Sequence, residues 1–239
     1  MRPFPKTVSI LIIIVFLFFI LLETNNKVIP SGDQMKKISG GIENVTKTRL
    51  QYIAVGDSYT SGTGAQPEES WPSLLAEDLT KAGIPVELAA NPSRAGFTTA
   101  DALEKELPLL PERADLATLL IGANDWVQGG GPEIFRKNLR LLIDDLHRRV
   151  PKGRLFLITI PDLSSSPFGN FFSGGRNVSG GIQEFNRIIS EEAEARNLTI
   201  IDIFSVRLKP HQYADGIHPN AEGYAVWEKT IFEGIRPFL

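Results

Sequence analysis

The sequence predicts an α/β protein in which helices cover both faces of a five-stranded parallel sheet, preceded by an N-terminal hydrophobic helix. Three observations lead to this fold class: short continuous apolar runs, amphipathic segments between them, and strict alternation of the two after about residue 50. Continuous apolar runs are typical of parallel strands, which are buried on both faces. Such an α/β/α sandwich binds its ligands at the carboxyl ends of the strands.

The N-terminal segment has the composition of an export signal or a membrane anchor. Arg2 and Lys6 precede an apolar run from Val8 to Leu22 that only Ser9 interrupts. At about 1.5 Å per residue the run is somewhat shorter than the ~30 Å hydrocarbon core, which favours a signal peptide. The lack of a clear cleavage site favours an uncleaved anchor, so both interpretations of residues 1–26 stay open. Either one predicts a domain outside the cytoplasm, with the membrane as a partner if the helix is retained.

Residues 27–49 are polar and show no sustained periodicity, so we interpret them as a linker. The remaining residues, 50–239, suit a single folded domain. Within this domain we interpret five apolar runs as the strands of the sheet. They are Gln51 to Val55, Pro85 to Ala89, Leu116 to Ile121, Leu155 to Ile160 and Thr199 to Ile203.

Amphipathic segments fill the intervals between these strands and are predicted to be the covering helices. They are Ser70 to Ala82, Thr98 to Leu107, Pro132 to Val150, Ile182 to Arg196 and Asn220 to about Gly234. The segment from Pro161 to Gly181 is rich in Ser, Gly and Phe, and we expect it to be a long irregular loop.

The charge and the cysteine content exclude several classes of function. A net charge of -3 gives no basic excess for binding phosphates, so nucleic acid is not an expected partner. The chain has no cysteine, which excludes disulfides, a thiolate nucleophile and a cysteine-ligated metal site.

Residues with the chemistry of a serine hydrolase follow the predicted strands. Ser58 follows the first strand, and Asp215 and His218 stand in a turn after the fifth, just before the last helix. A serine hydroxyl becomes a nucleophile when an imidazole takes its proton, and a carboxylate must orient that imidazole. We therefore expect Ser58, Asp215 and His218 to be the catalytic residues, with no cofactor required.

Acyl transfer also needs hydrogen-bond donors for the oxyanion of the tetrahedral intermediate. The backbone N–H of Ser58, the backbone N–H of Gly96 and the side-chain amide of Asn124 are the candidates, because each follows a predicted strand. Asp125, next to Asn124, is interpreted as a structural residue.

These residues resemble the four sequence blocks of the SGNH (GDSL-like) hydrolase family, over about Leu50 to Phe238. The matching blocks are Gly56-Asp57-Ser58, Gly96, Gly122-x-Asn124-Asp125 and Asp215-x-x-His218-Pro219. The resemblance implies a flavodoxin-like fold, the same three catalytic residues and the same oxyanion donors. Gly56 to Gly62 and Leu119 to Trp126 look most similar to bacterial lysophospholipase- and thioesterase-like members. One departure is Tyr59, where the family commonly has leucine.

Two other histidines and a metal site are the alternatives for the chemistry. His147 lies beside two arginines near a helix end and is interpreted as a surface residue. His211 rivals His218 as the base but lacks the short Asp-x-x-His spacing. An oxygen-rich metal site would lack a second histidine at a strand end, so no metal is expected.

The substrate class is less sharply predicted than the chemistry. Aromatic residues near the expected site are Trp71, Phe97, Trp126, Phe168, Phe171 and Phe172. We take Trp126, Phe97 and Phe168 as candidate substrate-binding residues, although packing explains aromatic side chains equally well. The apolar loop favours an ester of a lipid or acyl chain, of the lysophospholipase type. An O-acetylesterase acting on cell-surface glycans and a non-catalytic tethered binding domain are the alternatives.

Overall fold

The computed structural model describes residues 49–239, which lie within one compact unit. The predicted signal or anchor at residues 1–26 lies outside the described residues, as does the predicted linker except for Arg49. Among residues 49–239 no helix is both long enough and apolar enough to cross a membrane.

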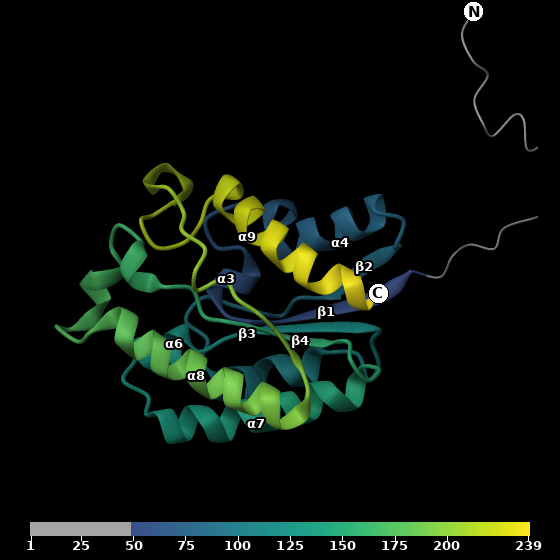
Figure 1. The fold of residues 1–239 in the computed structure, drawn as a ribbon, viewed down its shortest axis with the longest axis horizontal. Coiled ribbons are helices and arrows are strands. Elements are labelled where there is room, and N and C mark those ends of the chain that lie inside the picture. The colour runs from purple at the N-terminus through teal and green to yellow at the C-terminus, as the bar shows by residue number, and fades with distance from the viewer. Residues whose placement is uncertain (1–48) are drawn as a thin grey trace, which may run out of the picture. The chain divides into compact units, whose positions relative to one another are not determined.

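The prediction of a five-stranded parallel sheet is confirmed, and Figure 1 shows the sheet between two layers of helices. Its strand order is β2-β1-β3-β4-β5, and every pair of neighbours is parallel. The strands are β1 (Leu50–Gly56), β2 (Val86–Ala90), β3 (Leu116–Leu120), β4 (Leu155–Ile158) and β5 (Thr199–Ile201). The three central strands β1, β3 and β4 are almost entirely buried, which explains their continuous apolar sequences.

The strand order fixes where a ligand site can form. The chain runs from β1 outward to β2 and then returns to the other side of β1 to form β3. A crevice opens at the carboxyl ends of two strands where the direction of winding reverses in this way. The pairing of Gly56 with Leu120 ends β1 and β3 at the same level, so the segments that follow both strands leave the sheet side by side.

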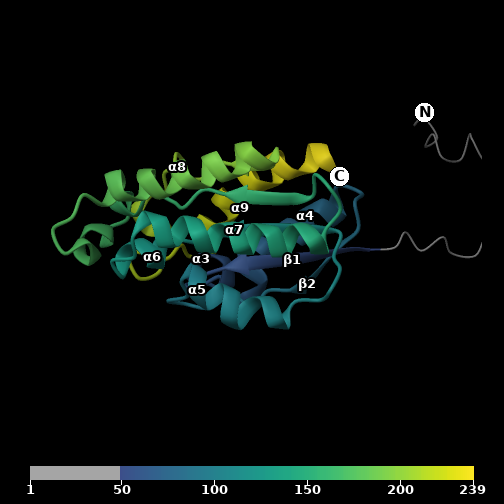
Figure 2. The same cartoon turned by 90° about the horizontal axis from the view of Figure 1, so that it is seen from below.

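Two pairs of helices form the outer layers. Figure 1 shows α4 (Trp71–Lys81) and α9 (Ala221–Ile235) above the sheet, and α7 (Pro132–Arg149) and α8 (Val178–Arg196) below it. Figure 2, seen from below, shows α7 and α8 running along the strands. The apolar faces of these helices close the core, which explains their predicted amphipathic patterns.

Two helices differ from their predicted bounds. Helix α8 begins at Val178, before the predicted start at Ile182, because the Asn177 side chain accepts the N–H of Gly180 and caps the helix. The segment predicted as one helix, Thr98 to Leu107, is helical but is not one regular α-helix. It consists of a short α-helix, α5 (Thr99–Asp101), a π-helical turn (Ala102–Glu106) and a 3₁₀ turn (Leu107–Leu109). Pro108 lacks an N–H and cannot continue an α-helix. Glu106, the last residue of the π-helical turn, is buried.

Candidate active site

Ser58 begins a short helix at the end of the central strand β1. Helix α3 (Ser58–Ser61) starts after Asp57, whose Oδ1 atom accepts the N–H of Tyr59 at 3.0 Å. The helix ends at Gly62, which has a φ of 82°. As the first residue of this helix, Ser58 has a backbone N–H without a partner in the helix. Its side chain is 5% exposed and lines a cavity.

Asp215 and His218 form a pair in the loop that precedes α9. His218 Nδ1 lies 2.7 Å from Asp215 Oδ2, and Asp215 Oδ1 accepts the backbone N–H groups of Ile217 and His218. A hydrogen bond from the Ala214 N–H to the carbonyl of His218, 2.9 Å long, closes the loop. Burial raises the pKa of Asp215, but these hydrogen bonds outweigh it and hold the pKa below its ordinary value. The carboxylate is therefore charged and turned toward the imidazole.

The loop that carries His218 packs directly on the segment that follows Ser58. The Tyr224 hydroxyl of α9 donates to the carbonyl of Thr63 at 2.8 Å. Gly64 has a φ of 101°, and a Cβ there would lie 2.5 Å from the Pro219 carbonyl, so only glycine permits this approach. The rings of Tyr59 and His218 are 5.5 Å apart. Tyr59, the departure from the family pattern, thus supports the histidine.

Ser58, Asn124 and His218 line one cavity of about 130 Å³. Asn124 lies on helix α6 (Ala123–Val127), which follows β3 directly. A second cavity of about 430 Å³ adjoins it and shares Ile217 and His218 in its lining. The predicted catalytic serine, histidine and oxyanion asparagine therefore lie around the same space at the crevice between β1 and β3.

Gly96 lies beside Asn124 in the turn between β2 and α5. The Asn124 side-chain amide donates to the carbonyl of Phe97 at 3.0 Å, and the Gln128 amide donates to the carbonyl of Gly96 at 3.0 Å. Gly96 is exposed and has a φ of 83°, and it is not among the residues that line the cavity at Ser58. These bonds fasten the Gly96 turn to α6 and bring it next to the site.

Three buried carboxyl groups support the strand ends. Asp125 accepts the N–H and the hydroxyl of Thr99, which ties α6 to α5 in a structural role. Burial raises the pKa of Asp57 to about 7. Burial likewise raises the pKa of Glu106 to about 8, although this carboxyl accepts the N–H of Gly56 at 3.2 Å. Sequence reasoning missed Glu106, because charged residues are expected at the surface.

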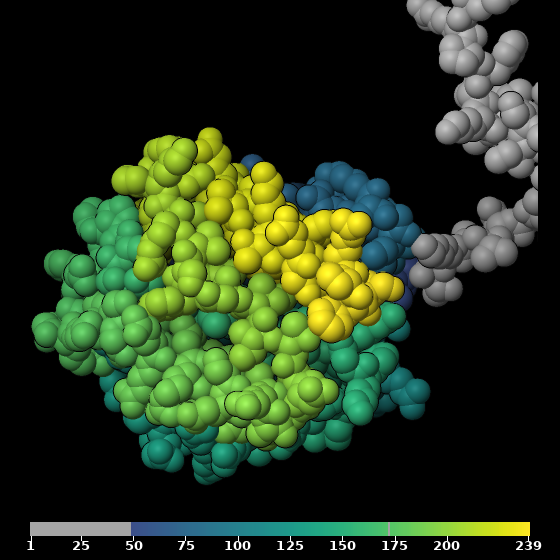
Figure 3. Space-filling model, viewed as in Figure 1, coloured from purple at the N-terminus to yellow at the C-terminus, as the bar shows by residue number. Residues whose placement is uncertain are grey.

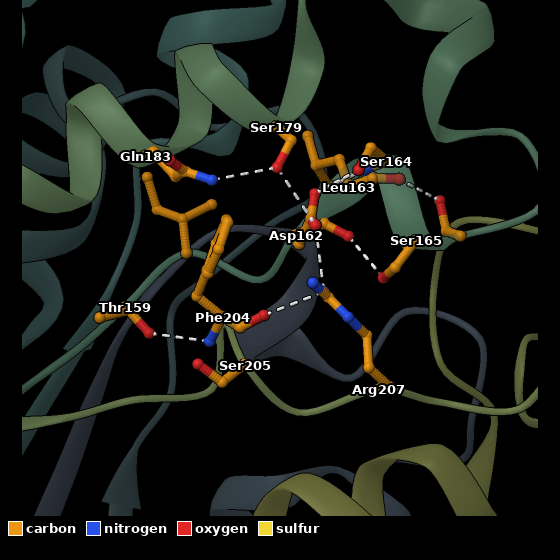
Figure 4. A network of polar contacts seen from close by, with 12 residues as sticks. Thr159, Asp162, Leu163, Ser164, Ser165, Ser179, Gln183, Phe204, Ser205 and Arg207 are labelled. Atoms are coloured by element: carbon orange, nitrogen blue, oxygen red, sulfur yellow. Dashed lines mark hydrogen bonds and ion pairs between the residues drawn. The ribbon is translucent and has the colours of Figure 1, made fainter.

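The loop between β4 and α8 forms one wall of the site. Its buried Asp162 accepts the N–H of Ser164 at 3.0 Å, and Arg207 binds the same carboxylate at 3.0 Å (Figure 4). Ser179, at the start of α8, donates to it at 3.3 Å. Asp162 thus fastens this loop to α8 and to the segment that leads from β5 to His218. Sequence reasoning did not single out Asp162 or Arg207, because nothing in the local pattern relates them.

The three candidate substrate-binding aromatics lie in different environments. Phe168 is exposed and lines the larger cavity together with Asp215 and His218. Trp126 is buried, with the guanidinium of Arg176 4.1 Å from its ring, and it lines neither of the two cavities. Phe97 is half-buried with Lys105 over its ring. The burial of Trp126 favours packing, so Phe168 is the best placed of the three.

The alternative histidine His211 lies away from these groups. It is exposed and 3.6 Å from Glu222, and it lines neither cavity. Among residues 49–239 no group of three or more His, Asp or Glu side chains is arranged to hold a metal ion.

Comparisons with known proteins indicate the family of the chain. The sequence profile of the GDSL-like lipase/acylhydrolase family matches residues 54–226. The chain is 28% identical to an arylesterase of Vibrio mimicus over 174 residues, which cover 71% of this chain and 80% of that protein. It is 36% identical over 129 residues, 52% of this chain, to a multidomain esterase of Ruminococcus flavefaciens, of which it spans 16%. A lipase/acylhydrolase structure from Enterococcus faecalis has a TM-score of 0.61 at 25% identity, covering 80% of this chain and 96% of that one.

Proposed function

Because the chain belongs to the GDSL-like lipase/acylhydrolase family and is an ester hydrolase, we propose that it cleaves the carboxylic esters of single-chain lipids, with Ser58 as the nucleophile. The observation that carries this proposal is the shared cavity of Ser58, Asn124 and His218, combined with the 2.7 Å contact between His218 Nδ1 and Asp215. That contact leaves Nε2 of the imidazole to accept a proton from the serine.

In the first step, Ser58 Oγ attacks the ester carbonyl carbon while His218 Nε2 takes the hydroxyl proton. The carbon–oxygen bond to the alcohol then breaks, and His218 returns the proton to the leaving alkoxide. A water molecule then attacks the acyl carbon while His218 takes one of its protons. The bond between the acyl carbon and Ser58 Oγ breaks, His218 returns the proton to Oγ, and the acid leaves. Asp215 stays ionised throughout and stabilises the imidazolium that forms at each attack.

The oxyanion of each tetrahedral intermediate is bound by the backbone N–H of Ser58, the backbone N–H of Gly96 and the side chain of Asn124. The free N–H at the start of α3 and the position of Asn124 on the cavity wall support two of these donors. The hydrogen bonds of Asn124 and Gln128 to the Gly96 turn support the third. No cofactor takes part in these steps.

The larger cavity supports an acyl chain as the substrate group. Phe168, Phe171 and Ile217 line it beside His218, so an apolar chain there would bury carbon surface next to the reacting carbonyl. The second candidate substrate is an acetyl ester of a glycan. An acetyl group is small enough to need only the cavity of about 130 Å³ at Ser58 and would leave the larger cavity unused.

The apolar N-terminal run supports a location outside the cytoplasm, which cell fractionation of the full chain would test.

The test uses p-nitrophenyl esters from acetyl to palmitoyl, together with lysophosphatidylcholine and acetylated xylan. Ser58→Ala should abolish turnover and labelling by a fluorophosphonate while the fold is retained. Turnover that rises with chain length supports the lipid ester, and turnover confined to acetyl groups supports the glycan. Full activity in Ser58→Ala would overturn the mechanism.

A further inference from the structure

Two exposed phenylalanines stand at the tip of the loop between β4 and α8. Phe168 is 58% exposed and Phe171 is 85% exposed. They are three residues apart in a segment that includes a 3₁₀ turn (Gly169–Ser173). Neighbouring apolar surface of this kind marks a site of interaction more often than an isolated exposed side chain does.

The tip carries no negative charge. From Leu163 to Gln183 the sequence has no Asp or Glu, and its single charged residue is Arg176. The guanidinium of Arg176 donates to the carbonyls of Trp126 and Val127. The chain as a whole has a net charge of -3, so the absence of acidic residues over this stretch is local. Such a segment enters an apolar phase without burying a carboxylate, which would be costly.

The tip is continuous with the proposed ester site. Phe168 and Phe171 line the larger cavity together with Ile217, Asp215 and His218. Figure 3 shows the segment between β4 and α8 beside the segment between β5 and α9 on the surface of the molecule. An acyl chain that leaves a lipid layer at the tip would reach His218 within the same cavity.

The loop is held in its position by several contacts. The Phe168 N–H donates to the carbonyl of Gly216 at 2.9 Å. Gly216 has a φ of 85°, and a Cβ there would lie 2.3 Å from the Phe168 ring, so the ring sits directly on the loop that carries Asp215 and His218. Asp162 fastens the other side of the loop to Arg207 and Ser179. A preformed tip binds without the entropic cost of ordering it.

We propose that the Phe168–Phe171 tip docks on the surface of a lipid aggregate, a micelle or a bilayer, and so delivers ester lipids to the larger cavity. The proposal rests on the proposed function only in that the delivered ester is cleaved at Ser58. Docking itself requires no catalysis. The attraction is apolar, so it should depend little on salt and should not require anionic lipid.

The test measures binding of residues 49–239 to phosphatidylcholine vesicles by co-sedimentation, in the Ser58→Ala background. These residues contain the complete sheet and core of a compact unit. The apolar N-terminal run is omitted because it would bind lipid by itself. Circular dichroism and the melting temperature verify that each variant is folded.

Phe171→Ser should weaken vesicle binding by about tenfold or more, because an aromatic side chain buries a large apolar area. The matched control is Ile134→Ser, an exposed apolar residue on α7, 64% exposed, which should bind within about twofold of the parent. Asn170→Asp adds a carboxylate to the tip at an exposed position that lines neither cavity. It should weaken vesicle binding severalfold and, with Ser58 present, leave hydrolysis of monomeric p-nitrophenyl acetate unchanged.

Equal binding by the Phe171→Ser and Ile134→Ser variants, or no binding by the parent, would overturn the docking proposal. A dimer that forms without lipid and is lost in Phe171→Ser would show instead that the tip binds a second copy of the chain. Vesicle binding that persists while Ser58→Ala retains esterase activity would overturn the proposed function and leave docking intact.

Discussion

His218 Nδ1 and Asp215 Oδ2 lie 2.7 Å apart, and the second oxygen of the same carboxylate accepts the backbone N–H of His218 itself. The carboxylate thus holds both the ring and the backbone of one residue within a four-residue turn. Because the pKa of Asp215 is lowered, its carboxyl group is charged and can polarise the imidazole of His218. The orientation of His218 is set largely by local chain geometry, whereas the proposed nucleophile Ser58 comes from a distant part of the sequence.

Asp215→Asn tests this orientation. An asparagine retains an oxygen for the backbone N–H groups but loses the charge that stabilises the imidazolium and selects its tautomer. We expect kcat on p-nitrophenyl esters to fall by about 10³ to 10⁴, with little change in melting temperature. His211→Asn is the control and should keep the parental kcat, because the His211 side chain is exposed and lies beside Glu222, away from the cavity at Ser58. A loss below about tenfold in Asp215→Asn would contradict the assigned role.

Asn124→Ala tests the oxyanion contribution of the amide. We expect kcat to fall by about 10² to 10³ while KM changes little, because the donor acts mainly on the transition state. Asn124 also holds the carbonyl of Phe97, so part of the loss could come from the Gly96 turn. Gln128→Ala separates the two effects, since Gln128 holds the same turn but lies outside the cavity at Ser58. An equal fall in kcat in both variants would mean that Asn124 acts only by holding the Gly96 turn in place.

The strands were predictable because their physical cause is local. Strands buried on both faces need continuous apolar residues, and β1, β3 and β4 show that pattern directly. The short helices α3 and α6 were not predicted, because four or five residues are too few to show helical periodicity. The start of α8 was missed because Gly180 and Gly181 read as loop residues.

The candidate site was predictable to the extent that its groups follow strand ends. Ser58, Asn124 and His218 come together because parallel strands end at one edge of the sheet. The supporting contacts were not predictable in this way. Asp162 binds Arg207, and the N–H of Phe168 donates to the carbonyl of Gly216. Both contacts join loop segments that are far apart in the sequence, so no local sequence pattern indicates them. Glu106 turns inward because of a π-helical turn, which its sequence does not indicate.

Glu106→Gln tests the buried carboxyl beneath β1. Burial raises the pKa of Glu106 to about 8, above the ordinary value near 4.5, so the folded state holds a proton that the unfolded chain releases. Its contribution to stability is therefore fully present below about pH 4.5 and is lost as the pH rises toward 8. Glutamine imitates the neutral carboxyl and abolishes this dependence.

We therefore expect the two proteins to unfold at similar urea concentrations near pH 4.5, and the variant to become more stable relative to the parent as the pH rises to 8. The gain is of order 1 to 4 kcal/mol, since one pKa unit corresponds to about 1.4 kcal/mol. Asp57 also has a raised pKa and is present in both proteins, so its own titration largely cancels, whereas its repulsion of Glu106 is part of the expected gain. A constant difference between parent and variant across this pH range would contradict the assignment.

Asp162→Ala tests whether the loop between β4 and α8 is held in place for the substrate. Removing this carboxylate leaves the N–H of Ser164 and the hydroxyl of Ser179 without this acceptor and removes the ion-pair partner of Arg207. We expect the free energy of unfolding to fall by about 1 to 3 kcal/mol. Because Phe168 in this loop lines the larger cavity, kcat/KM should fall more for palmitoyl than for acetyl esters.

Arg207→Ala is the control. It removes one exposed partner of the Asp162 carboxylate and should lower the free energy of unfolding by less than about 1 kcal/mol. Proportional losses on both esters would mean that Asp162 stabilises the fold without positioning the wall of the acyl cavity.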